Sequence, residues 1–344
     1  MPITEMLFTI EKYAIRLSSR FLRRCFSKNV DVLSTDAEEL MLHRNHNFIS
    51  VSREDEKCLN IAILGAPNVG KSTLVNQLIK RSVCAISCKV HTTQAKADAI
   101  YSENNTQLIF MDTPGMVSPG ELKRFKLAKS FERDPNASLK TADIIGLVQD
   151  VDNTFARDKI NPNIFKLLKN MEDKIPMILI FNKVDRLKKK NTLLDLAKVL
   201  TKSKNSLKFT DVFMISALTG DGVDDLRTYL LDSAKPRKWH YEEHIYSNQT
   251  CEDIIQQTVR AKLLDNLPQE MPYNMQVKLE HFDPGPDDSV STLVSVTCPN
   301  KRICSILFRR KGERLRNIAL MAEQELRHAF RTPVKLKINV QSAT

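Results

Sequence analysis

The segment at residues 65–73, Gly-Ala-Pro-Asn-Val-Gly-Lys-Ser-Thr, constrains the fold of this chain more than any other feature. An apolar run at 59–64 leads into the segment and a helix-like run at 74–79 leads out of it. The spacing fits the phosphate-binding loop G-x-x-x-x-G-K-[ST], which lies between a strand and a helix. The alternative is a chance match in a turn, and the flanking strand and helix patterns argue against it.

Each residue of this loop has a distinct task in such a site. Gly65 and Gly70 are expected where a Cβ atom would obstruct the tight turn and the approach of a phosphate. Lys71 is expected to reach the β- and γ-phosphate oxygens, and the Ser72 hydroxyl to ligate Mg²⁺. The other loop residues predicted to contact the nucleotide are Pro67, Asn68, Val69 and Thr73.

Two downstream motifs favour a GTPase switch. Thr93 follows the first helix, where GTPases place a residue that meets Mg²⁺ and the γ-phosphate; by itself this Thr-Thr pair could equally be an ordinary loop. The strand at 107–111 runs into Asp-Thr-Pro-Gly at 112–115. Asp112 is predicted to hold Mg²⁺, and the Gly115 N–H to approach the γ-phosphate.

A fourth motif, Asn-Lys-Val-Asp at 182–185, predicts recognition of guanine. The Asp185 carboxylate can accept two hydrogen bonds from N1–H and the exocyclic amine, a donor pair that adenine lacks. Lys183 is expected to lie along the ring, and Asn182 to tie this loop to the phosphate-binding loop. Ser216 and Ala217 follow the last strand and complete the predicted nucleotide contacts as the final guanine loop.

Strands alternate with helices over residues 57–232, which predicts an α/β, doubly wound, mostly parallel sheet. The motifs then lie at the carboxyl ends of strands, where such sheets bind ligands. We therefore expect a nucleotide-binding domain at 57–235.

A smaller α+β unit is predicted at 236–344, after a linker. A helix at 251–267, strands at 273–281 and 292–298, a helix after residue 312 and a strand at 334–340 are expected. Seven basic residues and one acid lie between Lys301 and Arg316. This pattern is typical of a loop that binds an RNA backbone, although a solvated basic face would look the same. The predicted RNA contacts are Arg309, Arg310, Lys311, Gly312, Arg314 and Arg316.

The net charge indicates a class of partner, and the N-terminal residues indicate a cellular location. A formal net charge of +11 favours a polyanionic partner, either nucleic acid or an anionic membrane. Residues 1–30 form a basic amphipathic pattern, so residues 1–56 are predicted to be a mitochondrial presequence, cut after Phe26, and a linker. The alternative is a partner-binding helix. The seven scattered cysteines indicate a reducing compartment.

Together these motifs resemble the Era family of GTPases over residues 57–340. The Pro-Asn pair in the phosphate-binding loop and the segment at 260–273 are family features, and the basic stretch at 309–312 stands where the family has a G-x-x-G loop. The insert at 118–135 resembles the animal mitochondrial branch. The resemblance implies a KH-type (type II) RNA-binding domain. Two residues depart from the family pattern, Gln94 in place of Arg and Arg309 in place of the first Gly.

The resemblance also implies a function. It suggests slow GTP hydrolysis to GDP and phosphate, gating the binding of small-subunit rRNA during assembly of the mitochondrial small ribosomal subunit. The expected location is the mitochondrial matrix, with peripheral contact with the inner membrane allowed and no DNA partner. Met116 is apolar where Ras-like enzymes have a glutamine, so by analogy Asn68 would help hold a K⁺ ion. The expected catalytic group is Asn68, Lys71, Thr93 and Gly115.

Two other functions stay open at this point, because no general base is visible in the sequence. One is a GTP-binding RNA scaffold that does not hydrolyse the nucleotide. The other is a membrane-associated signalling GTPase that uses the basic N-terminus.

Overall fold

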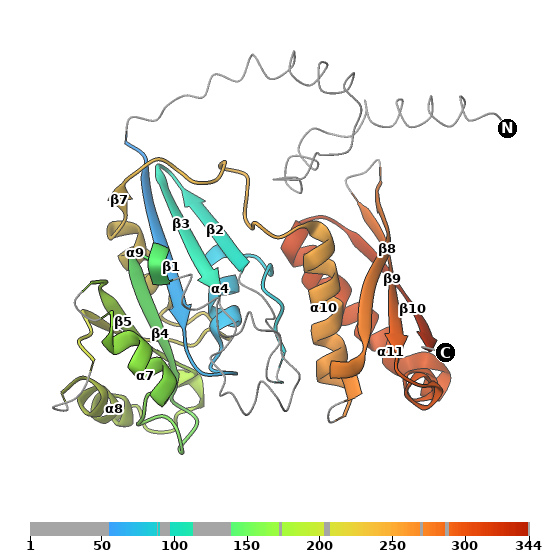
Figure 1. Cartoon of the computed structure of the whole chain (residues 1–344), viewed down its shortest axis with the longest axis horizontal. Helices are drawn as coiled ribbons and strands as arrows, with labels where there is room; N and C mark the ends of the chain where they lie inside the picture. The colour runs from blue at the N-terminus through green and yellow to red at the C-terminus, as the bar shows by residue number, and fades with distance from the viewer. Residues whose placement is uncertain are drawn as a thin grey trace, which may run out of the picture.

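The computed structural model describes residues 55–87, 89, 97–112, 139–171, 174–202, 207–268, 271–285 and 289–342. Thr93, Gly115 and residues 1–54 of the predicted presequence lie outside the described residues. For Asp112 and residues 309–311, only the backbone is described. Two sheets lie in separate lobes joined by a linker (Figure 1).

The first lobe contains a sheet with strand order β2-β3-β1-β4-β5-β6. A short strand, β7, pairs antiparallel with the first two residues of β1. The strands β3, β1, β4, β5 and β6 are mutually parallel, which confirms the predicted mostly parallel fold. The strands are β1 (Lys57–Leu64), β2 (Ala97–Glu103), β3 (Thr106–Asp112), β4 (Ile144–Asp150), β5 (Met177–Asn182), β6 (Asp211–Met214) and β7 (Lys235–Pro236).

Helices cover both faces of this sheet, as the alternation of its side chains requires. In β1, Ile61 and Ile63 pack with α4 (Lys71–Ile79) and α9 (Val223–Asp232). Ala62 and Leu64 face the other way. There they pack with α7 (Pro162–Lys169) and α8 (Asn191–Lys202). Because successive side chains of a strand point to opposite faces, a run buried on both sides is almost continuously apolar.

The second lobe is a three-stranded sheet, order β10-β9-β8, with two long helices. β8 is antiparallel to β9, and β10 is parallel to it. The order of elements and this mixed pairing confirm the predicted smaller α+β domain of KH type. The elements are α10 (Cys251–Asn266), the 3₁₀ turn η2 (Met271–Asn274), β8 (Gln276–Pro284), β9 (Val290–Cys298), α11 (Lys301–Phe330) and β10 (Val334–Ser342).

Helix α11 differs from its prediction. It begins at Lys301, where the Asn300 side chain accepts a hydrogen bond from the Ile303 N–H at 3.0 Å, and it runs on both sides of Gly312. Leu307 is fully buried in the core that α11 shares with the sheet, which explains why the helix starts before the basic stretch. Gly312 interrupts the helical backbone with φ of +76°. The basic stretch therefore lies inside a helix and not in a loop that precedes one.

Strand β2 was not predicted. Its sequence, Ala-Asp-Ala-Ile-Tyr-Ser-Glu, contains few β-branched residues and follows directly after the expected switch loop. It is an edge strand, antiparallel to β3, and pairing with that strand determines its structure.

The linker between the lobes is fixed to the first lobe by buried polar contacts. The Gln107 side chain is fully buried, and its Oε1 accepts the N–H groups of His240 and Tyr241 at 3.0 and 3.1 Å. Arg237 donates two hydrogen bonds to the Asp143 carboxylate, at 2.9 and 3.0 Å. The linker thus runs over the edge of the sheet before it enters α10 (Figure 1).

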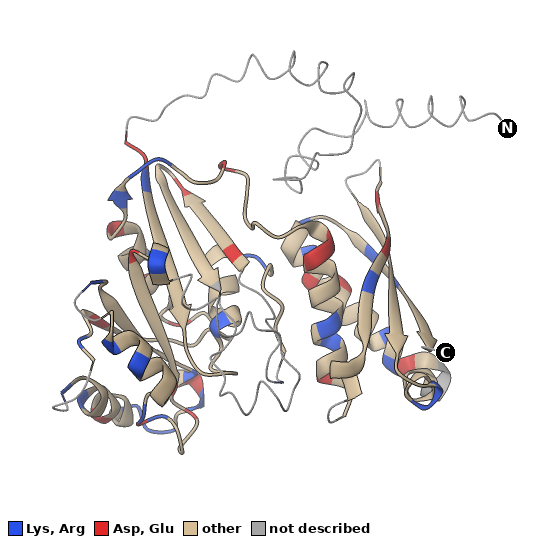
Figure 2. Ribbon diagram, in the orientation of Figure 1, with Lys and Arg blue, Asp and Glu red and all other residues tan. Residues whose placement is uncertain are grey.

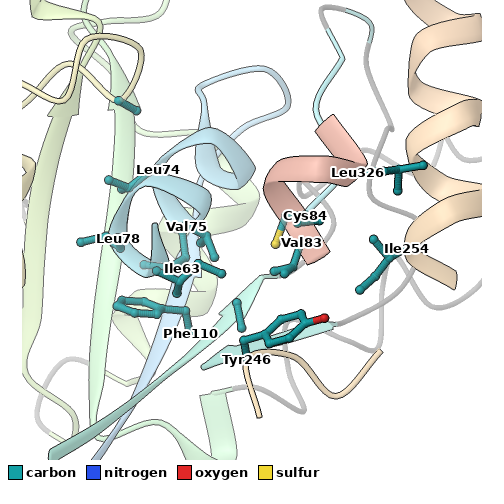
Figure 3. Packing of buried hydrophobic residues seen from close by; sticks show 14 of the residues in the cluster. Ile63, Leu74, Val75, Leu78, Val83, Cys84, Phe110, Tyr246, Ile254 and Leu326 are labelled. Carbon is teal, nitrogen blue, oxygen red and sulfur yellow. The ribbon is translucent and has the colours of Figure 1, made fainter. Parts of the chain in front are cut away.

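One apolar cluster passes from the first lobe into the second. Figure 3 shows Val83, Cys84 and Tyr246 between the core around Leu74 and the helical residue Leu326 of the second lobe. Among the described residues, no helix is long and apolar enough to cross a membrane.

Candidate nucleotide-binding site

The phosphate-binding loop joins the end of β1 to the start of α4 in a backbone shape that depends on glycine. Gly70 is the N-cap of α4, with φ of +97°. A Cβ atom on Gly70 would lie 2.3 Å from Asn182 Nδ2, and one on Gly65 would lie 2.6 Å from the Val148 carbonyl oxygen. The glycines are therefore required by neighbouring protein atoms as well as by the expected phosphate.

Lys71 places a cation inside this loop. Its side chain is buried, and Nζ donates to the carbonyl oxygens of Gly65 and Ala66 at 3.2 and 3.0 Å. A buried ammonium is stable only with polar or anionic partners. Together with the N-terminus of α4, whose first turn has no acidic residue, it forms a site suited to a polyphosphate.

Asn182, the last residue of β5, connects three loops. Its Nδ2 donates to the Val69 carbonyl at 2.8 Å, and its Oδ1 accepts the N–H groups of Lys183 and Ala217 at 2.8 and 2.9 Å. One amide side chain thus holds together the phosphate-binding loop, the Asn-Lys-Val-Asp loop and the loop after β6. Ser216 and Ala217 are both buried in that last loop.

The two charged residues of the Asn-Lys-Val-Asp loop differ in their surroundings. Asp185 lies in the 3₁₀ turn η1 (Val184–Arg186) and is exposed, with no hydrogen-bond partner among the residues that the structure describes. A carboxylate so placed is available to the N1–H and amine donors of guanine. Lys183 Nζ donates to the Asn68 carbonyl at 2.8 Å and to Asp150 Oδ2 at 2.6 Å.

Asp150 is a residue of this site that the sequence motifs did not reveal. It is the last residue of β4, and its Cα pairs with that of Asn182 in the neighbouring strand. The only signal in the sequence is an acidic residue at the end of an apolar strand, which is common. Its position beside the end of β5, and hence beside the Asn-Lys-Val-Asp loop, is known only from the folded sheet.

The backbone also brings the expected Mg²⁺ ligands to this edge of the sheet. Asp112 ends β3, which is adjacent to β1, and its Cα pairs with Ile63, two residues before Gly65. Ser72 is the second residue of α4 and is half-buried. Ser72 and Asp112 would hold the ion, which would supply positive charge to offset that of the phosphates. Thr93 and Gly115 are outside the described residues.

The predicted RNA contacts lie on the other lobe. Arg314 and Arg316 are exposed on α11, just after the interruption at Gly312. A Cβ atom on Gly312 would meet nothing within 4 Å, so the backbone is open to a ligand there. Figure 2 shows Lys and Arg on both lobes, α11 included, so the overall positive charge alone does not single out one face.

Comparison with known proteins is consistent with this geometry. The sequence profile of the 50S ribosome-binding GTPase family matches residues 60–183. The mitochondrial GTPase Era of Danio rerio is 32% identical over 340 residues, which span 84% of this chain and 76% of that protein. GTPase Era of Mesorhizobium japonicum is 34% identical over 281 residues, spanning 82% and 87% of the two chains.

Two solved structures of Era superpose on most of the chain, both at 28% identity. Aquifex aeolicus Era bound to GDP·AlF₄⁻ has a TM-score of 0.71 and covers 83% of this chain and 94% of its own. Era in complex with MgGDPNP and nucleotides 1506–1542 of 16S ribosomal RNA has a TM-score of 0.70, with coverages of 84% and 94%. The identity and the coverage extend over both lobes, so this chain is a GTP-hydrolysing enzyme that belongs to the Era family.

Proposed function

We propose that this chain is a GTP-dependent RNA chaperone that binds small-subunit rRNA in mitochondria and assists assembly of the small ribosomal subunit. The observation that carries the proposal is the match of both lobes to an Era structure that contains a fragment of 16S ribosomal RNA. The location follows from the mitochondrial relatives and from the basic amphipathic pattern of residues 1–30.

The proposed RNA surface is centred on the interruption of α11. Gly312 allows close approach of a nucleic acid backbone, and the exposed Arg314 and Arg316 supply phosphate contacts. Arg309, Arg310 and Lys311, which directly precede Gly312 in the sequence, are included in the proposed RNA contacts. Arg309, in the place of the family's first glycine, would contribute a guanidinium contact to phosphate instead of a bare backbone.

In the proposed nucleotide cycle, Ser72, Thr93 and Asp112 would hold Mg²⁺, and Asn68 would help to hold a K⁺ ion, which would supply positive charge beside the leaving phosphate. Hydrolysis is then slow and stimulated by K⁺. GTP turnover measured in K⁺ against Na⁺ tests this step. Equal rates in the two salts would remove the K⁺ ion from the proposal without affecting the RNA assignment.

The central experiment is crosslinking of the protein to RNA in its own cells, followed by sequencing of the attached RNA. We expect reads from the 3′ region of mitochondrial small-subunit rRNA. The variant Arg314→Glu/Arg316→Glu should lose them, and in vitro its affinity should depend less steeply on salt because fewer phosphates are neutralised. Lys188→Glu/Lys189→Glu changes the charge equally at exposed positions of the first lobe and is the matched control.

Two outcomes would contradict the proposal. Reads that come mainly from other RNAs would exclude the assembly function. Equal loss of crosslinking in both charge-reversed variants would show that binding depends on total charge and not on the surface around Gly312.

A further inference from the structure

The end of β4 and the end of β5 are joined by an ion pair beside the nucleotide site. Asp150 Oδ2 and Lys183 Nζ are 2.6 Å apart, and their side chains are only 16% and 24% exposed. The other carboxylate oxygen, Oδ1, accepts the Asp152 N–H at 2.9 Å. Both oxygens of Asp150 are therefore engaged, and the carboxylate has a fixed orientation.

The ammonium of Lys183 also reaches the phosphate-binding loop. Nζ donates to the Asn68 carbonyl at 2.8 Å. Asn68 is exposed and has a left-handed backbone, with φ of +60°, which is unusual for a residue other than glycine. Lys183 is itself left-handed, with φ of +67° and ψ of +35°. Two residues with left-handed backbones, 115 positions apart in the sequence, are thus held together by one ammonium group.

The Asn68 carbonyl alone would not fix the position of the Lys183 ammonium. A lysine side chain has four rotatable bonds, and ordering it costs up to about 2 kcal/mol of side-chain entropy. The single Asn68 carbonyl is a weak restraint on such a chain, whereas the added contact with the oriented Asp150 carboxylate pairs two full charges in a partly buried site. Asp150 supplies that restraint from a strand end that is itself fixed by the sheet.

We propose that Asp150 is a positioning residue of the nucleotide site. It holds Lys183 so that the stem lies along the guanine ring and the ammonium fixes the Asn68 carbonyl. In this way Asp150 connects the base-binding loop to the phosphate-binding loop, without touching the nucleotide. The proposal rests on guanine nucleotide binding alone and is independent of the RNA partner.

The test is the rate of GDP release from the full chain, measured with a fluorescent GDP analogue. Asp150→Asn keeps the size of the side chain and removes its charge. We expect release to be about tenfold faster, because the substitution removes the negative charge that holds the Lys183 ammonium and leaves only a neutral amide acceptor. Asp152→Asn is the matched control, because Asp152 lies in the same loop and pairs with Arg186 at 3.2 Å in an exposed position. Its release rate should stay near that of the wild type.

A double-mutant cycle separates positioning from a general loss of structure. Lys183→Met keeps an apolar stem and removes the ammonium. If Asp150 acts through Lys183, then Asp150→Asn should add no further acceleration in the Lys183→Met background. A tenfold acceleration in that background would overturn the proposal, and so would equal release rates in the Asp150→Asn and Asp152→Asn variants.

Discussion

Gly70 shows how two separate requirements can fall on one residue. Its φ of +97° is a conformation that residues with a Cβ atom adopt at a cost, and its Cβ position would lie 2.3 Å from Asn182 Nδ2. The same Asn182 holds the loops on either side of the base. A side chain at Gly70 would therefore disturb the base-binding loops as well as the phosphate-binding loop.

This geometry predicts a difference between two alanine substitutions. Gly70→Ala and Gly220→Ala both place a side chain at positive φ, where the expected strain is about 1–2 kcal/mol. Only Gly70→Ala adds a collision, because a Cβ atom on Gly220 (φ of +88°) would meet nothing within 4 Å. We expect Gly70→Ala to lose more thermal stability than Gly220→Ala, and only Gly70→Ala to weaken GDP binding, by more than about 100-fold. Titration calorimetry with GDP measures this, and similar affinities in the two variants would contradict it.

The role of a residue could be predicted from the sequence where the residue is part of a local motif. It could not be predicted where the role depends on a partner that is distant in the sequence. The spacing of Gly65, Gly70 and Lys71 predicts the loop because the chemistry requires those residues close together in the chain. Asp150 belongs to no motif, and its partner Lys183 directly follows another strand, so only the register of β4 and β5 reveals it.

Helices α10 and α11 are connected by a buried ion pair. Lys262 of α10 pairs with Glu325 of α11, and their side chains are 12% and 11% exposed. Burial raises the pKa of Glu325, an effect that Lys262 and the Ile86 backbone N–H only partly oppose. Oε1 of Glu325 is buried without a hydrogen-bond partner in the described structure. The folded protein therefore holds the Glu325 proton more tightly than the unfolded chain does.

The upward shift in the pKa of Glu325 determines how the unfolding free energy of the protein changes with pH. A carboxyl group whose pKa is raised on folding stabilises the protein below its ordinary value, near 4.5, and that contribution is lost as the pH rises through the folded value. Glu325→Gln removes this titration. The unfolding free energy of the wild type, relative to that of Glu325→Gln, should therefore fall as the pH rises above 4.5. Urea unfolding from pH ~4 to ~8 measures it.

Glu313→Gln, an exposed position on the same helix, is the control for this experiment. It should follow the wild type across the whole range. If Glu325→Gln also follows the wild type, the pKa of Glu325 is not raised by folding.

Elements with a strong local pattern could be predicted, and those that depend on distant partners could not. The strands β1, β4 and β5 are apolar runs, and motifs directly follow β1 and β5, so the strand type follows from the sequence. The first part of α11 contains the same basic residues as a surface loop would. Its helical structure depends on packing of Leu307 against the second sheet, which a local pattern does not encode.

At the scale of the whole molecule, the helix that starts at the phosphate-binding loop ends against the helix that carries the proposed RNA surface. α4 and α11 both end in a left-handed cap, at Lys80 and Arg331. Arg81 donates to the Ala329 carbonyl of α11 at 3.1 Å, and Arg331 donates to the Lys80 carbonyl of α4 at 3.4 Å. Each helix C-terminus, which carries partial negative charge, thus receives an arginine from the other lobe.

Further contacts reinforce this joint. The Arg81 guanidinium lies 4.3 Å from the centre of the Tyr246 ring in the linker, and the Ser82 hydroxyl is 2.7 Å from His328 Nδ1. Lys89, just before the expected switch loop, donates to the Leu267 carbonyl at the end of α10. The second lobe is therefore attached to residues 81–89, which precede the expected first switch loop, and a structural change in this segment can reach α10 and α11.

This arrangement predicts that nucleotide binding stabilises both lobes. GDP binds the first lobe, and its binding free energy adds to the stability of everything that unfolds with that lobe. We expect the wild type to unfold in one calorimetric transition that saturating GDP moves upward as a whole. In Arg81→Ala/Arg331→Ala the coupling should fall by about 3 kcal/mol, since two hydrogen bonds from charged groups, each contributing at least about 1.5 kcal/mol, are lost. The second lobe should then melt in a separate transition that GDP does not shift.

Arg302→Ala, an exposed arginine on α11 away from this joint, should keep the single transition. A single GDP-dependent transition in the Arg81→Ala/Arg331→Ala variant would mean that the apolar cluster of Val83, Cys84 and Leu326 couples the lobes by itself. In that case Leu326→Ala, which leaves a cavity in the buried cluster, becomes the substitution expected to separate the two transitions, because such a truncation costs about 2–5 kcal/mol.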